Sequence, residues 1–152
     1  MERITYQELP HGMFEKLRAI EDFIKTSSID QQLTELIKLR VSQINGCAYC
    51  VDMHHKELKH LGEDDLRLSS LCVWEETPYF SDIERVALHF AEALTRIDAK
   101  PLADEVYEPL LKYFNKEEIS FLSLIVTQIN TWNRLMKAFQ FVPGRYQVAV
   151  EA

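Results

Sequence analysis

The chain has 152 residues, of which 47% are hydrophobic and 27% charged, and its formal net charge at pH 7 is −7. A chain of this length can bury a hydrophobic core without help from disulfides or bound metal ions, so we expect one domain over residues 1–152. The acidic balance without a basic stripe argues against a nucleic-acid partner, and no apolar run approaches the ~20 residues that cross a bilayer.

Helical periodicity with few helix breakers predicts an all-α fold. Only four glycines and five prolines are present, and alternating runs rich in Val, Ile and Thr are absent. Residues 1–11 are expected to form an irregular arm; they lack the apolar core of a signal peptide, so we expect a cytoplasmic protein. The tail, residues 145–152, is predicted to be a short strand or an arm. The six to seven expected helices cover residues 12–25, 30–45, 46–61, 64–76, 81–97, 102–114 and 115–141.

Local signals mark several helix boundaries. Asp30 is a candidate N-cap, and Gly46 suits the left-handed conformation that closes a helix. Two segments with a capping-box pattern, 81–84 and 115–118, precede long periodic runs. Pro109 is expected to start a new turn or to kink the helix around it.

Two segments of the chain resemble each other. Residues 36–45 read LIKLRVSQIN and residues 121–130 read FLSLIVTQIN, an offset of 85 positions. We interpret this similarity as a duplicated helix pair of which only the first copy carries cysteines. The alternative is coincidence between two apolar helices.

The stretch ELIKLRVSQINGCAYCVDMH, residues 35–54, concentrates the reactive side chains. Cys47, Cys50 and His54 stand at i, i+3 and i+7, which predicts that they share one helical face. Glu35 precedes Cys47 by twelve residues, and an antiparallel helix pair would return it to the same place. The alternative for Glu35 is an exposed position on a helix surface. Two thiols, an imidazole and a carboxylate indicate a redox site.

The spacing distinguishes the two thiols. Thiolate is the attacking species, and a free cysteine with a pKa near 8.5 is mostly thiol at neutral pH. A helix N-terminus contributes only about 0.3–1 kcal/mol to thiolate stability, so a base or cation must help. His54 is the i+4 neighbour of Cys50. We therefore expect Cys50 to attack and Cys47 to resolve the product as a disulfide.

The cysteines and histidines have alternative interpretations. Cys47 and Cys50 are alternatively inert core residues, or zinc ligands together with His54 and His55 or His60. No second Cys-x-x-Cys completes a tetrahedral site, and the histidine of a c-type haem motif is missing. His55 and His60 are expected on a solvated face.

Three further residues are expected to be structural. Cys72 has no second cysteine close to it in the sequence and is predicted to be buried in the hydrophobic core. His89 is predicted to be a core or interface histidine, and Trp74 a core residue.

The stretch LRVSQINGCAYCVDMH, with Glu35 upstream, resembles the core signature of the AhpD-like alkylhydroperoxidase family, within the carboxymuconolactone decarboxylase superfamily. Close similarity covers about residues 33–62. The resemblance implies an all-helical fold, trimers or hexamers, and thiol peroxidase activity. It also implies a peroxidatic Cys50, a resolving Cys47, and a proton relay that includes His54 and Glu35.

Two departures from the superfamily matter for the chemistry. Some family members have histidine just before the second cysteine, where this chain has Tyr49, so the relay is expected to be slower or differently tuned. Superfamily members of the decarboxylase type act on a lactone and lack the cysteine pair, which counts against decarboxylation here.

The sequence thus predicts a thiol-dependent peroxidase that reduces hydrogen peroxide or alkyl hydroperoxides, with no metal, haem or flavin cofactor. Its expected partners are the peroxide and a dithiol or redox-protein reductant, with neither nucleic acid nor membrane. Two alternatives remain open: a disulfide reductase or thiol exchanger, and a helical oligomer that acts as a binding module or redox sensor. Lactone chemistry is a third, and it would not depend on either thiol.

Overall fold

The computed structural model describes residues 2–149, and these residues contain helices and no strand. The all-α prediction is therefore confirmed. The α-helices are α1 (Met13–Ile24), α2 (Gln31–Asn45), α3 (Ala48–His60), α4 (Asp65–Ser70), α5 (Asp82–Thr95), α6 (Asp104–Tyr107) and α7 (Lys116–Phe139). Short 3-10 helices are η1 (Tyr6–Glu8), η2 (Leu71–Glu76) and η3 (Glu108–Lys112).

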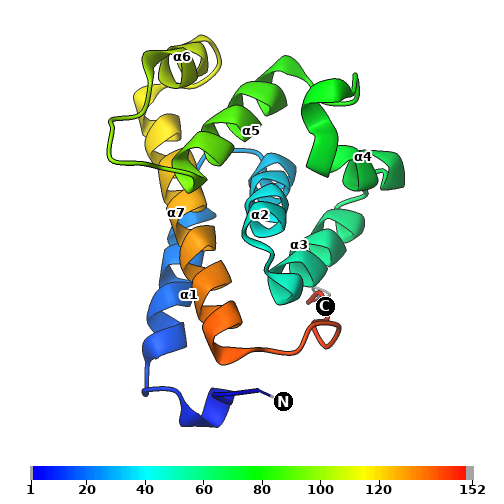
Figure 1. Ribbon diagram of the computed structural model, residues 1–152, viewed down its shortest axis with the longest axis vertical. Helices are drawn as coiled ribbons and strands as arrows, with labels where there is room; N and C mark the ends of the chain where they lie inside the picture. Colours follow the sequence, from blue (N-terminus) through cyan, green and yellow to red (C-terminus); the bar gives the residue numbers. More distant parts are fainter. Residues whose placement is uncertain (1, 150–152) are drawn as a thin grey trace.

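Helix α2 lies at the centre of the molecule, where it packs against α3, α5 and α7 (Figure 1). The long helix α7 also contacts α1 and α5. Chain reversal after α2 brings α3 back alongside it, as the sequence predicted. A helix surrounded in this way must bury side chains on more than one face.

Two apolar clusters flank α2. Ile37 and Val41 contribute to the cluster shared with α1, α5 and α7, while Leu36 and Leu39 contribute to the one shared with α3, η2 and α5. All four side chains are at most 1% exposed. Because both sides of α2 are buried, any polar side chain on this helix must find a partner inside the protein.

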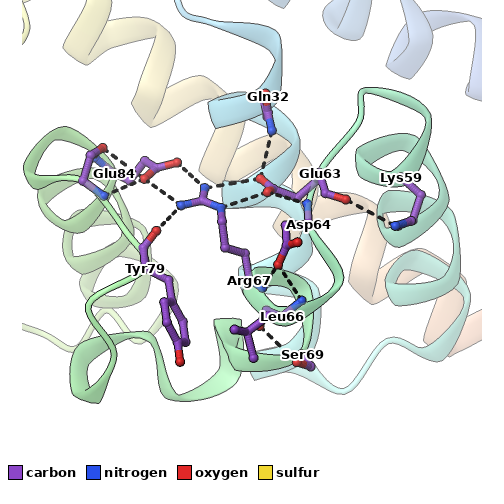
Figure 2. Close-up of polar contacts among 10 residues, drawn as sticks. Gln32, Lys59, Glu63, Asp64, Leu66, Arg67, Ser69, Tyr79 and Glu84 are labelled. Carbon is purple, nitrogen blue, oxygen red and sulfur yellow. Dashed lines mark hydrogen bonds and ion pairs between the residues drawn. The ribbon is translucent and has the colours of Figure 1, made fainter.

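A polar cluster around Arg67 connects the turn after α3 to α2 and α5 (Figure 2). The Arg67 guanidinium donates to Glu63 Oε1 at 2.8 Å and to Glu84 Oε1 at 2.5 Å, and it also contacts the Tyr79 carbonyl. Gln32 of α2 donates to the second Glu63 oxygen at 2.9 Å. This cluster holds the C-terminal end of α3 in place relative to α2 and α5.

The predicted caps are largely confirmed. The Asp30 carboxylate accepts from Leu33 N at 3.0 Å, and Gly46 closes α2 with φ of 61°. Capping boxes form at Ser81 and at Asn115.

Two expected segments differ in detail. The arm at the N-terminus contains the short helix η1. The segment 102–114 is divided into α6 and η3, and the new helix begins beside Pro109 as predicted, because proline has no backbone N–H to donate. Residues 145–149 have no regular secondary structure, and residues 150–152 lie outside the described residues.

The two similar segments lie in α2 and α7, which pack together, and Asn45 Nδ2 donates to the matching Asn130 Oδ1 at 3.0 Å. The expected second helix pair is not observed, because α7 continues without a turn to Phe139. Gly46 ends α2 in the left-handed conformation, whereas the matching position holds Thr131, whose branched side chain disfavours it. The similarity between residues 36–45 and 121–130 is therefore confined to one helix in each case and does not mark a duplicated helix pair.

Candidate functional site

The turn between α2 and α3 sets the position of both cysteines. Gly46 adopts φ 61°, ψ 39°, and the Cys47 amide donates back to the Ser42 carbonyl at 3.0 Å. Cys47 itself is extended (φ −90°, ψ 95°) and acts as the N-cap, so α3 begins at Ala48 and not at the first cysteine. Cys50 lies in the first turn of the helix.

Cys47 and Cys50 are joined by a disulfide, with a Cα–Cα distance of 5.4 Å. The Cys47 sulfur also accepts the Cys50 backbone N–H at 3.4 Å, which is the contact of an N-cap side chain. The two residues are 1% and 3% exposed. The spacing of three residues therefore allows a bond between the sulfurs, as expected.

An apolar shell surrounds this disulfide. Phe14 of α1 and Met136 of α7 pack against the cysteines in one cluster. Partly buried neighbours of the cluster are Leu9, Met13, Leu17, Tyr49, Trp132, Leu135, Phe139 and Phe141. Burial among such side chains disfavours a thiolate, so a reactive cysteine here needs a compensating charge or proton acceptor.

His54 supplies a candidate for that role. It lies one turn beyond Cys50 on the same face of α3, and its Nδ1 is 2.7 Å from Glu35 Oε2 of α2. Both residues are buried, at 6% and 8% exposure, so Glu35 is not the surface residue of the alternative prediction.

The protonation of this pair follows from its surroundings. Burial opposes the charge on Glu35, but His54 and Lys38 outweigh it and lower the pKa of the carboxyl to about 2. An ionised carboxylate only accepts hydrogen bonds, so His54 donates Nδ1–H and leaves Nε2 for another partner.

The polar network continues beyond the residues that the sequence singled out. Lys38 Nζ lies 3.2 Å from Glu35 Oε1 and 2.8 Å from Glu21 Oε2 on α1. The other Glu21 oxygen accepts from Trp132 Nε1 of α7 at 2.8 Å. Four helices thus meet through one chain of contacts. The i, i+3 spacing of Glu35 and Lys38 was a sequence signal for one link, but nothing local pointed to Glu21 or Trp132.

The segment after α7 lies against the outer side of α3. Lys56 Nζ donates to the carbonyls of Gly144 and Tyr146 at 3.3 and 3.1 Å, and the Tyr146 hydroxyl bonds to Glu57. Burial and the Glu57 hydrogen bond raise the pKa of Tyr146, with a further contribution from the charge on Glu35. Tyr146 was not singled out in the sequence.

Tyr49 stands where some relatives of the family signature have histidine. Its ring meets Phe141 edge to face at 5.9 Å. Burial, followed by the charges of Asp52 and Glu2, raises the pKa of the phenol. Tyr49 therefore holds its proton more tightly than a free tyrosine does.

The remaining reactive residues lie outside this site. Cys72 and His89 are both exposed, because each occupies the outward side of its helix. This corrects the predicted burial of Cys72 and the core alternative for His89, while the interface alternative for His89 stays a prediction. His55 and His60 are exposed as expected, and Trp74 is buried at 4% exposure. Within residues 2–149, no three His, Cys, Asp or Glu side chains gather closely enough to hold a metal ion.

Two surface hollows lie away from the sulfurs. One of about 240 Å³ is lined by residues that include Arg40, Cys72 and Glu92, and one of about 300 Å³ by residues that include Asn133 and Lys137. Neither has Cys47 or Cys50 in its lining. Over the described part of the chain, no helix has the length and apolar character needed to cross a membrane.

This chain is similar to known proteins in both sequence and fold. A profile of the carboxymuconolactone decarboxylase family matches residues 12–93. The uncharacterized protein YdfG of Bacillus subtilis (strain 168) is 40% identical over 135 residues, which cover 88% of this chain and 91% of YdfG.

Two solved structures are similar over most of the chain. The protein ATU0492 of Agrobacterium tumefaciens, described as of unknown function and as a candidate AhpD antioxidant-defence protein, superposes with a TM-score of 0.90 at 35% identity, covering 96% of this chain and all of that one. An uncharacterized peroxidase-related protein of Silicibacter sp. TM1040 has a TM-score of 0.77 at 25% identity, covering 86% of this chain and 70% of its own.

Proposed function

The chain belongs to the carboxymuconolactone decarboxylase family and to its AhpD-like members, and from that premise we propose that it is a thiol-dependent peroxidase for hydrogen peroxide or alkyl hydroperoxides. The observation that carries this proposal is the buried Glu35–His54 hydrogen bond, which leaves His54 Nε2 free on the helical face it shares with Cys50. A buried imidazole oriented by a carboxylate is suited to general acid–base catalysis beside a nucleophile.

In the first step, the Cys50 thiolate attacks the terminal oxygen of the peroxide. The S–O bond forms as the O–O bond breaks, so sulfur is oxidised to a sulfenic acid while the peroxide is reduced. The departing alkoxide or hydroxide takes a proton from His54 and leaves as alcohol or water. Glu35 holds the imidazole in position and stabilises its protonated form before the transfer.

In the second step, the Cys47 thiolate attacks the Cys50 sulfur. The S–S bond forms as the S–O bond breaks, and the proton that Cys47 gave to His54 passes to the departing hydroxide, which leaves as water. The Cys47–Cys50 disulfide corresponds to this oxidised end of the cycle.

A dithiol or a redox protein must then reduce the disulfide, with both of its thiols oxidised in turn. The apolar shell of Phe14, Met136 and their neighbours favours hydroperoxides that carry an apolar group, because such a group gains by leaving water. We therefore propose that alkyl hydroperoxides react faster than hydrogen peroxide.

One observation favours a second candidate, thiol–disulfide exchange. The Cys47 sulfur caps α3 and accepts the Cys50 N–H, which stabilises a Cys47 thiolate as leaving group or nucleophile. An exchanger would form and lose the disulfide readily but consume little peroxide.

Turnover of cumene hydroperoxide with excess dithiothreitol tests the proposal in wild type, Cys50→Ser and Cys47→Ser. We expect turnover in wild type and none in Cys50→Ser, while Cys47→Ser should accumulate a sulfenic acid at Cys50 that dimedone traps. Cys72→Ser removes the exposed free cysteine and serves as the matched control, with full activity expected. Rapid disulfide exchange without peroxide turnover would favour the second candidate, and dimedone labelling of Cys47 would reverse the assigned roles.

The resemblance also suggests assembly, and we propose that the protein forms trimers or hexamers. Light scattering at micromolar concentration checks this. A mass of 17.8 kDa, that of one chain, would contradict it.

A further inference from the structure

We propose that Lys38 and Glu21 are positioning residues of the thiol site, whose opposite charges set the pH at which Cys50 ionises. This inference rests on the proposed function in placing Cys50 and His54 at the reacting centre. Neither residue touches the sulfurs; both would act through the net charge of the network that includes Glu35.

Every carboxylate oxygen in the network has a partner. Glu35 contacts His54 through one oxygen and Lys38 through the other, and Glu21 divides its oxygens between Lys38 and Trp132. The side chains of Lys38, Glu35 and Glu21 are 10%, 10% and 20% exposed. Since fully satisfied networks in low dielectric are rigid and strongly coupled, a change of charge at one member is felt by the others.

Lys38 balances part of the negative charge of the network. Burial disfavours the ammonium of Lys38, but Glu35 and Glu21 outweigh this and raise its pKa, so Lys38 stays charged. Two carboxylates and one ammonium therefore carry a net charge of −1 beside His54, which stands one turn from Cys50.

The groups that face the network are few. α1 contributes Glu21 and α3 contributes His54, while α7 contributes the neutral indole of Trp132. The segment after α7 contributes Tyr146, which is neutral because its pKa is raised.

The two residues should act in opposite directions. Removing the Lys38 charge leaves excess negative charge, which disfavours a thiolate and raises the pH at which Cys50 ionises. Removing the Glu21 charge does the reverse, because the charges of Lys38 and Glu35 then cancel and less negative charge opposes the thiolate. A purely structural role for these residues predicts loss of stability without opposite shifts.

The rate of Cys50 alkylation by iodoacetamide, measured against pH, reports thiolate formation without any peroxide. A Cys47→Ser, Cys72→Ser background leaves Cys50 as the single cysteine. Relative to this background, we expect the midpoint to rise by about half a pH unit in Lys38→Met and to fall by about half a unit in Glu21→Gln. Lys38→Arg, which keeps the charge, should return the midpoint to the reference value.

Arg40→Met is the matched control. Arg40 lies on the same helix and its partly buried guanidinium pairs with Glu92 at 2.6 Å, outside the network, so its loss should leave the midpoint unchanged. The proposal is overturned if either the Lys38→Met or the Glu21→Gln midpoint stays at the reference value, if both move in the same direction, or if Lys38→Arg is displaced as far as Lys38→Met. If Lys38→Met does not fold, the alkylation midpoints of Glu21→Gln and Lys38→Arg alone decide whether the proposal holds.

Failure here is distinct from failure of the proposed peroxidase activity. Opposite midpoint shifts in a protein without peroxide turnover would support the electrostatic roles and reject the peroxidase. Unshifted midpoints in an active peroxidase would do the reverse.

Discussion

Glu35 Oε2 lies 2.7 Å from His54 Nδ1, although the two residues are 19 positions apart and belong to different helices. Both are almost inaccessible to water, and the carboxylate is held at its other oxygen by Lys38. This contact connects the central helix α2 to the face of α3 that carries Cys50.

Glu35→Gln should reduce peroxide turnover by about 100-fold while the protein remains folded, because a neutral amide holds the imidazole but does not stabilise its charge. The measurement is kcat/KM for cumene hydroperoxide beside the thermal midpoint. Glu92→Gln removes a partly buried carboxylate, one that pairs with Arg40, and should lower stability without this loss of rate. Equal rates for Glu35→Gln and wild type would contradict a role for Glu35 in the relay.

The same carboxyl should make stability depend on pH. The pKa of the Glu35 carboxyl is about 2 in the folded protein, against 4.5 without the surroundings that the fold provides. Its contribution to the stability of the fold is therefore complete above about pH 4.5 and is lost as the pH falls towards 2. That difference corresponds to about 3 kcal/mol at neutral pH. Urea unfolding at fixed protein concentration across this range should show a shallower decline for Glu35→Gln than for wild type. The variant should keep some acid sensitivity, since the pKa values of Glu63 and Glu92 are also lowered. Parallel curves would show that Glu35 contributes no linkage.

Gly46→Ala should destabilise the protein by about 1–2 kcal/mol, because α2 ends at this position with φ of 61°. Steric overlap is not the cause: a Cβ there would meet Lys137 Nζ at an ordinary 3.7 Å. Gly46→Asn should cost less, since asparagine tolerates the left-handed conformation better. Urea denaturation compares the three proteins. Equal losses for alanine and asparagine would indicate that some other property of the glycine matters.

Arg67→Met should destabilise the protein by about 3–5 kcal/mol, because Glu63, which is 4% exposed, would lose its ion-pair partner (Figure 2). Lys59→Met is the control: Lys59 pairs with the exposed Asp65, and its loss should cost less than about 1 kcal/mol. Urea denaturation of both variants gives the comparison. Similar losses for the two would show that the cluster around Arg67 contributes no more than a surface ion pair.

Much of this protein was predictable from sequence because the relevant order is local. Apolar spacing and the capping residues Asp30, Ser81 and Asn115 determine where helices begin, since 3.6 residues per turn and four unpaired amides at each start apply to any helix. The same period places Cys50 and His54 on one face of α3. Gly46 marks the reversal that returns the chain along α2.

The tertiary structure alone decided what lies opposite each helix. Glu35 meets His54, and Lys38 meets Glu21, because four helices cross around α2. The same sequence signals left Cys72 predicted as buried when it is exposed, and gave no sign of Trp132 in the network. The physical reason is that helical periodicity states which side chains share a face, whereas burial and partners depend on interhelical packing between segments far apart in the chain. Sequence thus determined the reactive face of α3, and packing determined the charges that surround it.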